Sequence, residues 1–360
     1  MIKNAYIHIP FCKSKCNYCS FTSFTKPDLI EQYVCSLKNE IEHFYEHEKL
    51  NTLYFGGGTP SLLSIAQLEE ILNLFSFEFC AEITLEANPN DLSAKYLDNI
   101  LNIGINRLSI GVQTFNDNIL KIIGRRHSSS EAFEAVLLAK KAGFNNISID
   151  LIYGLPNQTI ENFKNDLEIA VSLPVQHLSF YGLKIEEGCR FYDNSPKNLP
   201  NIDLQADMYE LLCEFLKKHC FEHYEISNFS KNGFNSRHNL NYWNNNSYYG
   251  FGISAHGFDN NVRYSNKNNL DDYFNNPLEH DSSYILSEDE KLEEEIFLGF
   301  RKGSGIDIQD VNNKFGINFE EKYSNILKKY ETFFIRTNFG YAFNTKGFLI
   351  SNEILSEFIN

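Results

Sequence analysis

Residues 8–21 read HIPFCKSKCNYCSF, and three of the eight cysteines of the chain lie within this stretch. Cys12, Cys16 and Cys19 have the spacing C-x3-C-x2-C and follow a short apolar run at residues 5–9. Soft thiolate ligands at such short spacings allow one loop to wrap around a metal. Lys13 and Lys15 add positive charge that favours the thiolate form of the cysteines. The stretch therefore predicts a metal-binding loop at the end of a strand.

The spacing leaves several kinds of site open. A zinc site usually needs a fourth Cys or His, and a ferredoxin-type cluster needs a fourth Cys; neither is evident in the loop. Three ligands on a cube of four irons would leave one iron free for a small molecule. A zinc knuckle completed by a distant residue and an incidental cysteine-rich loop remain alternatives. The other cysteines, which we interpret as small packing residues, are Cys35, Cys80, Cys189, Cys213 and Cys220.

Apolar runs and segments with helical periodicity alternate along the first half of the chain. The runs predict buried strands at residues 5–9, 52–55, 83–86, 107–111, 147–151 and 178–181. The periodic segments predict helices at residues 29–44, 65–75, 94–101, 132–142 and 160–170. Such alternation is typical of right-handed parallel units, in either an open doubly wound sheet or a partial TIM-type barrel.

Polar residues and glycines recur where the predicted strands end. Gly57, Gly58 and Thr59 follow the second strand, in a GGGTP run where the backbone can approach a ligand closely. Three further polar residues mark the ends of the next strands: Glu86, Gln113 and Asp150. Because the carboxyl ends of barrel strands meet at one rim, these residues predict a single pocket there.

The remainder of the chain has a different pattern. Residues 204–218 predict a helix, and an Asn-, Tyr- and Gly-rich, loop-rich stretch runs from 228 to 276. From Ser287, an acidic segment with an N-cap serine predicts an amphipathic helix. We therefore expect a barrel at 1–230, a connector at 231–285 and a small α+β C-terminal domain at 286–360.

Composition excludes several classes of protein. The 360 residues are 42% hydrophobic, enough for a large core, and 32 basic against 47 acidic residues give a net charge of −15. This sign disfavours binding to nucleic acid or to an anionic membrane surface. No apolar run approaches the ~18 residues of a membrane span, and residues 1–10 lack the pattern of a signal peptide. We expect a soluble, cytoplasmic protein.

The cysteine loop, with Tyr18 before its last cysteine, resembles that of the radical S-adenosylmethionine (SAM) superfamily. The resemblance implies that Cys12, Cys16 and Cys19 hold a [4Fe-4S] cluster whose fourth iron binds the methionine part of SAM. Reductive cleavage of SAM can then give a 5′-deoxyadenosyl radical, with the cofactors supplying the chemistry and the protein orienting them.

Within this superfamily, the order of motifs is similar to the coproporphyrinogen-oxidase-like branch, the HemN and HemW group, over almost the entire chain. The resemblance implies that Tyr6 and Tyr18 flank the cluster and SAM. It also implies a set of SAM contacts, namely Gly57, Gly58, Thr59, Glu86, Gln113, Arg125 and Asp150.

Two features separate the branches of this group. The oxidases carry a fourth cysteine two places after the third and a long segment before the first strand. Here Phe21 occupies that place, and eleven residues precede Cys12. Residues 237–243, RHNLNYW, instead resemble the HNxxYW motif of the HemW branch, which is proposed to pass haem to acceptors. The imidazole of His238 is a candidate iron ligand, and Tyr242 and Trp243 offer flat surface for a macrocycle.

His256, in the following GFGISAH segment, is a second candidate ligand, with a structural histidine in a glycine-rich turn as its alternative. The leading hypothesis is a haem chaperone that delivers haem to a respiratory or storage haemoprotein. The alternative is an oxygen-independent coproporphyrinogen III oxidase. A homodimer is a further expectation from the family.

Overall fold

Nine strands form the main sheet within residues 1–359, the part of the chain that the computed structural model describes. Their bounds are β1 (Asn4–Ile9), β2 (Lys49–Gly57), β3 (Ser76–Ala87), β4 (Arg107–Gln113), β5 (Asn146–Tyr153), β6 (His177–Gly182), β7 (Glu222–Glu225), β8 (Asn228–Ser230) and β9 (Tyr249–Phe251). The spatial order is β7-β8-β6-β5-β4-β3-β2-β1-β9. Strands β1 to β6 pair in parallel, as do β1 and β9, whereas β8 pairs antiparallel with β6 and β7.

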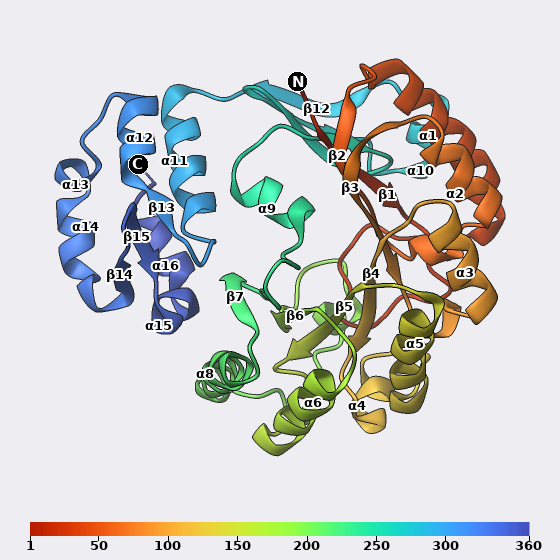
Figure 1. Cartoon of the computed structure of the whole chain (residues 1–360), viewed down its shortest axis with the longest axis horizontal. Coiled ribbons are helices and arrows are strands. Elements are labelled where there is room, and N and C mark those ends of the chain that lie inside the picture. Colours follow the sequence, from red (N-terminus) through yellow and green to blue (C-terminus); the bar gives the residue numbers. More distant parts are fainter. Residues whose placement is uncertain (360) are drawn as a thin grey trace.

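Helices connect these strands along one side of the sheet, as Figure 1 shows. Their bounds are α1 (Ile30–Phe44), α2 (Ile65–Leu72), α3 (Ala94–Asn102), α4 (Asp117–Ile122), α5 (Ser129–Ala142), α6 (Ile160–Ser172), α7 (Arg190–Asp193) and α8 (Ile202–Lys218). Capping boxes at Ser64, Ser128 and Thr159 begin α2, α5 and α6. With the helices on the outer side, the sheet curves into a partial barrel, and the doubly wound alternative is excluded. The predicted α/β class is confirmed.

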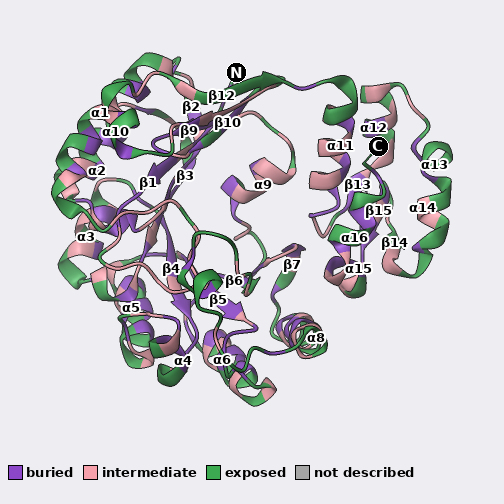
Figure 2. Ribbon diagram, turned by 180° about the vertical axis from the view of Figure 1, so that it is seen from behind, coloured by how far each residue is buried: buried purple, intermediate pink, exposed green. Residues whose placement is uncertain are grey.

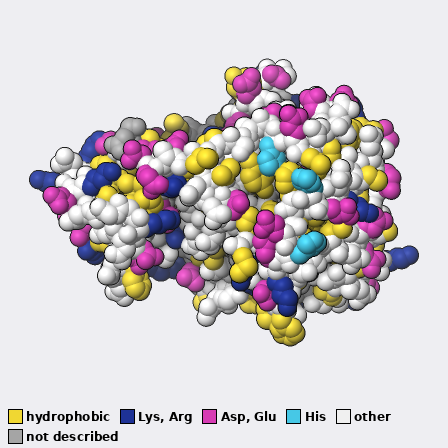
Figure 3. Space-filling view, turned by 90° about the horizontal axis from the view of Figure 1, so that it is seen from above, with side chains coloured by type: hydrophobic (Ala, Val, Ile, Leu, Met, Phe, Trp, Pro, Cys, Tyr) yellow, Lys and Arg dark blue, Asp and Glu magenta, His cyan; other side chains and the backbone are white. Residues whose placement is uncertain are grey.

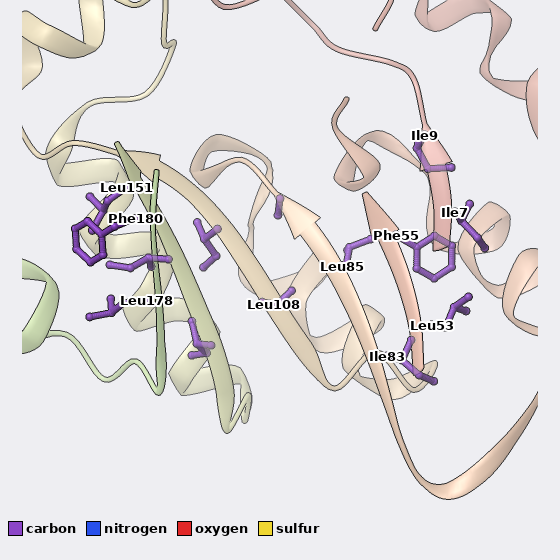
Figure 4. Packing of buried hydrophobic residues seen from close by; sticks show 14 of the residues in the cluster. Ile7, Ile9, Leu53, Phe55, Ile83, Leu85, Leu108, Leu151, Leu178 and Phe180 are labelled. Atoms are coloured by element: carbon purple, nitrogen blue, oxygen red, sulfur yellow. The ribbon is translucent and has the colours of Figure 1, made fainter. Parts of the chain in front are cut away.

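Side-chain alternation divides each barrel strand between two environments. One set of positions packs beneath the helices, as Figure 4 shows for Ile7, Leu53, Ile83 and their neighbours. Burying each such side chain contributes about 1.5–3 kcal/mol. The positions between them face the barrel interior and are largely polar, for example Asn4 and Thr52. The helices therefore hold the sheet from outside, and the interior is left for polar groups.

The open side of the barrel is occupied by helix α9 (Arg237–Trp243), which carries the HNLNYW residues. Figure 1 shows α9 between the barrel and the C-terminal helices. The carboxylate of Glu82 on β3 accepts hydrogen bonds from the backbone N–H groups of Arg237 at 3.3 Å and His238 at 3.1 Å. Asn4 on β1 donates to Asn241 at 2.6 Å. Glu82 on β3 thus holds the N-terminal end of α9, and Asn4 on β1 holds its side.

The C-terminal part follows a small antiparallel sheet. That sheet consists of β10 (His256–Asp259), β11 (Val262–Asn266) and β12 (His280–Ile285), with α10 (Leu270–Asn275) between the last two. Then come α11 (Glu288–Gly299), β13 (Ile306–Asp307), α12 (Ile308–Phe315), α13 (Phe319–Lys322), α14 (Ser324–Lys329), β14 (Phe334–Arg336), β15 (Gly340–Phe343), α15 (Thr345–Leu349) and α16 (Ser351–Ser356). Backbone hydrogen bonds from Ile226 to Arg301 and from Gly303 to Tyr224 join this part to the barrel.

Two expectations from the sequence were wrong. The stretch at 228–276 is not mainly loop, because it supplies β9, which extends the main sheet beside β1, and most of the β10–β11–β12 sheet. Three cysteines interpreted as packing residues, Cys35, Cys80 and Cys220, are exposed, whereas Cys189 is buried. Cys35 is on α1, Cys80 on β3 and Cys220 in the turn after α8, and which face of each segment is exposed depends on tertiary packing. Figure 2 shows the buried strands beneath helices whose outer faces are exposed.

Candidate functional site

The cysteine loop has a fixed conformation at the carboxyl end of β1. Its base is closed by hydrogen bonds from Phe24 N to the Pro10 carbonyl at 2.6 Å and from Cys12 N to the Phe24 carbonyl at 3.0 Å. Its far side is held by Asn17, whose N–H donates to the Ile123 carbonyl at 3.0 Å. These contacts attach the loop to the end of α4, so the positions of the cysteines depend on two neighbouring barrel segments.

Cys12, Cys16 and Cys19 line one cavity of about 440 Å³ in the barrel mouth. Thr59 donates a hydrogen bond to the sulfur of Cys12 at 3.4 Å, and Arg125 donates to that of Cys16 at 3.6 Å. Burial raises the pKa of Cys12 and raises that of Cys19 to about 11. Without a metal the raised pKa values favour the protonated thiols of Cys12 and Cys19, and metal binding would displace these protons.

The geometry of the cysteines bears on the kind of metal site. Among residues 1–359, no group of three His, Cys, Asp or Glu side chains is close enough to hold one metal ion. The three thiols line one cavity, and Thr59 and Arg125 donate hydrogen bonds to two of the sulfurs, as residues around metal-bound thiolates commonly do.

The GGGTP turn packs directly against the cysteine loop. Gly57 has a φ of +108°, and its N–H donates to Glu86 at 3.2 Å. A Cβ on Gly58 would lie 2.8 Å from the carbonyl oxygen of Phe11 and 2.9 Å from that of Ile9. Backbone cannot yield to such an overlap, so glycine at this position permits the close approach of the two loops.

Two largely buried carboxyl groups line the cavity, Glu86 on β3 and Asp150 on β5, with β4 between the two strands. Glu86 accepts a hydrogen bond from Tyr54 at 2.8 Å, and Asp150 accepts from Ser109 at 3.0 Å. Burial, followed by the charge of Asp150, raises the pKa of Glu86 to about 7; burial also raises the pKa of Asp150. A cationic ligand in the cavity would favour the ionised form of both groups.

Arg125 is positioned beside the cysteines. Its guanidinium donates to Asn88 at 2.6 Å and to the Gly111 carbonyl, while its Nε is buried without a partner. Gln113 has a φ of +71° at a register shift between β4 and β5 and also lines the cavity. The adjacent Arg126 approaches Asp91 at 3.9 Å, so Arg125 is the one of the two that contacts cysteine.

Most of the residues predicted for the cluster and SAM line the cavity, but Tyr6 does not. Those that line the cavity are Cys12, Cys16, Cys19, Tyr18, Gly57, Gly58, Thr59, Glu86, Gln113, Arg125 and Asp150. Tyr6 stacks on Tyr54 instead, and its hydroxyl is hydrogen-bonded with His8 Nδ1 at 3.0 Å. Lining residues that sequence reasoning missed include Tyr54, Arg107, Ser109, Tyr181 and Asn239. Most of them could have been found from the sequence, because side chains alternate between the two faces of a strand and these lie at interior-facing positions of the predicted strands.

The α9 residues proposed for haem lie behind the cavity. His238 is buried, and its Nδ1 and Nε2 are hydrogen-bonded with Thr52 and Tyr242, each at 2.8 Å. Its ring stacks on Tyr54 with centroids 5.0 Å apart. Burial, with the nearby charge of Arg107, lowers its pKa to about 3. To bind iron, His238 would have to exchange one of these hydrogen bonds for the metal.

The other haem candidates have different surroundings. The indole N–H of Trp243 is buried without a hydrogen-bond partner, as are both carboxylate oxygens of Glu225. Burial raises the pKa of Glu225 to about 7, although the side chains of Asn228 and Trp243 favour its ionised form. His256 lies exposed on β10, away from the residues that line the cavity.

Comparison with known proteins gives consistent matches. A model of the radical SAM superfamily matches residues 6–170, and one of the HemN C-terminal domain matches residues 286–333. A "Heme chaperone HemW" of Lactococcus lactis is 40% identical over 99% of this chain and 97% of its own length. One of Bacillus subtilis is 36% identical over 99% of both chains.

Among solved structures, that of Escherichia coli coproporphyrinogen III oxidase (HemN), titled a radical SAM enzyme, has a TM-score of 0.87. It covers 99% of this chain and 90% of its own, at 23% identity. At that identity the similarity shows the shared fold. No helix in residues 1–359 is long and apolar enough to cross a membrane.

The burial of His238 leads to a pH prediction. Its pKa is about 3 when folded and 6.5 ordinarily, so between these values only the unfolded chain binds the proton. Stability linked to His238 is complete above pH 6.5 and is lost as the pH falls toward 3, by roughly 1.4 kcal/mol per pH unit. Relative to His238→Gln, urea unfolding should show wild type losing about 0.7 kcal/mol from pH 7 to 6 and about 1.2 kcal/mol from pH 6 to 5. A pH-independent difference would contradict the buried, neutral imidazole.

Proposed function

The chain belongs to the HemW family of the radical SAM superfamily, and we propose that it is a haem chaperone that holds a [4Fe-4S] cluster and SAM and passes haem to an acceptor haemoprotein. One observation carries the proposal. Three cysteines and the polar residues expected to contact SAM line a single cavity. The heme chaperones of Lactococcus lactis and Bacillus subtilis match this chain over 99% of its length.

Cys12, Cys16 and Cys19 would hold three irons of the cluster. Thr59 and Arg125 already donate to two of the sulfurs, and such donors stabilise thiolate charge. A reduced cluster bound here would supply the electron for the cleavage of SAM. Lys13, whose ammonium pairs with Asp91 at 2.7 Å, helps fix the loop to the turn after β3.

The polarity of the cavity suits SAM, which carries a sulfonium, an ammonium and a carboxylate. Glu86 and Asp150 would face its cationic and ribose parts, and their raised pKa values would fall as the ligand's positive charge entered. Arg125 would meet the carboxylate, since its buried Nε has no other partner. Gly57 and Gly58 would leave backbone accessible to the amino group.

An alternative is an oxygen-independent coproporphyrinogen III oxidase, because the fold of HemN is shared. Against it stands Phe21, at the position where the oxidases have a fourth cysteine. This side chain is 66% exposed and lines the cavity. The thiol that the oxidases have at this position of the loop is therefore absent here, which disfavours the oxidase reaction.

The remaining parts of the proposal concern partners and location. We propose haem as the cargo, a respiratory or storage haemoprotein as the acceptor, the cytoplasm as the compartment and a homodimer as the assembly. Nucleic acid is disfavoured by the net charge of −15. Figure 3 shows acidic side chains scattered among basic and apolar ones over one face. Haem, itself anionic, would then depend on local residues.

Each cluster cysteine can be tested separately. Cys12→Ala, Cys16→Ala and Cys19→Ala should each lose the brown absorbance and most of the bound iron after anaerobic reconstitution, since the cube would lose a ligand. Cys35→Ala, at an exposed position on α1, is the matched control and should keep both. Full iron content in any of the first three variants would reject that cysteine as a ligand.

Haem ligation by α9 can be separated from its structural role. His238→Ala combined with Trp243→Ala should weaken the Soret band that develops with haemin. Thr52→Val and Tyr242→Phe each remove one hydrogen bond of His238 but keep the imidazole, so they should retain or strengthen the band. If these two variants lose haem as fully as the double variant, His238 acts by holding the structure. An unchanged spectrum in the double variant would reject the motif's role.

A further inference from the structure

Arg107 is an unusual feature of the barrel interior. It is the first residue of β4, it is 1% exposed, and it lines the inner end of the cavity. Its Nε has no hydrogen-bond partner among the described residues. Burial alone would lower the pKa of this guanidinium, but the charge of Glu82 and neighbouring tyrosines raise it overall. Arg107 therefore remains charged, and its Nε–H is free to donate a hydrogen bond to a ligand.

The acidic neighbours of Arg107 are engaged elsewhere. Glu82 accepts the backbone N–H groups at the start of α9, and Asp150 accepts from Ser109. Both act on Arg107 through charge and offset its desolvation, but neither is hydrogen-bonded to its Nε–H. A bound anion would supply the acceptor that this buried donor lacks. The planar guanidinium fork fits a carboxylate in bidentate geometry.

Two further residues, Asn239 and Tyr181, line the same cavity as Arg107. Asn239, beside His238 on α9, lines the cavity, and in the HNLNYW segment it is the residue that does so. Its backbone N–H donates to the Ser236 hydroxyl at 3.2 Å, and its side-chain amide is a group that can donate hydrogen bonds to a carboxylate. Tyr181 at the end of β6 is 44% exposed and lines the same space. An amide donor and an aromatic face thus accompany the guanidinium.

We propose that Arg107 and Asn239 form a carboxylate-binding subsite at the inner end of the cavity, which takes a propionate side chain of a tetrapyrrole with its macrocycle toward Tyr181. The identity of the ligand rests on the proposed function, whereas the carboxylate chemistry rests on the geometry. The other carboxylate in the system belongs to SAM. Its candidate partner, Arg125, donates to the carbonyl of Gly111, four residues along β4 from Arg107, and also to Asn88 and to the sulfur of Cys16 beside the cysteine loop.

The test compares haemin with haemin dimethyl ester, in which both propionates are blocked. Binding to the anaerobically reconstituted protein is followed by Soret titration. Wild type should bind haemin at least about tenfold more tightly than the ester, as expected for charged hydrogen bonds. Arg107→Met should lose about tenfold or more for haemin but little for the ester, so that the preference disappears. Arg107→Lys should restore part of it, since charge returns without the fork.

Asn239→Ala should reduce the preference to a smaller degree, and it keeps the test decisive if Arg107→Met does not fold. Arg107→Met should lower the thermal midpoint without ligand, because buried Glu82 loses a favourable charge, so the titrations are made well below that midpoint.

Each contrary outcome has a distinct meaning. If wild type binds neither haemin nor its ester, the proposed function fails. If wild type binds both equally, or if the variants lose both equally, the subsite is wrong while haem binding stands. If Arg107→Met loses SAM in equilibrium dialysis but keeps the preference for haemin, the carboxylate bound here is that of SAM, and the tetrapyrrole assignment is overturned.

Discussion

The carboxylate of Glu82 on β3 accepts two backbone N–H groups at the start of α9, and this contact determines what the open barrel can contain. A six-stranded arc of parallel strands leaves one side without a wall. Helix α9 fills that side, and from it His238 stacks on Tyr54, whose hydroxyl in turn donates to Glu86 at the cavity. The segment that resembles a haem motif is therefore joined to the SAM-type residues through two aromatic rings.

Electrostatics in this interior is local. The chain carries a net charge of −15, yet two arginines with an unpartnered Nε, Arg107 and Arg125, line the same cavity. The pKa of Glu86 is raised to about 7 and burial raises the pKa of the Cys12 and Cys19 thiols, so the cavity holds less negative charge than its composition suggests. Protonation of these groups leaves the cavity ready for ligands that bring cations, such as irons and a sulfonium.

Much of the barrel could be predicted from the sequence, because strand and helix periodicities there reflect burial beneath an outer layer of helices. Gly58 and the three cysteines could likewise be located from spacing and strand ends. The short strand β9 could not, because its place beside β1 depends on a distant chain segment. The sequence predicts Arg107 as the beginning of a buried strand, and alternation places it on the interior face, but only the folded barrel shows that this face borders a cavity. The burial of His238 depends on Thr52 and Tyr54, which only the folded chain brings together.

We propose that this radical SAM barrel binds a finished tetrapyrrole and does not convert a precursor. An anaerobic assay of the reconstituted protein with SAM, a reductant and coproporphyrinogen III, with products separated by chromatography, tests this directly. We expect no protoporphyrinogen IX above the level of a cluster-free Cys12→Ala control. Cluster-dependent formation of protoporphyrinogen IX over several turnovers would instead establish the oxidase.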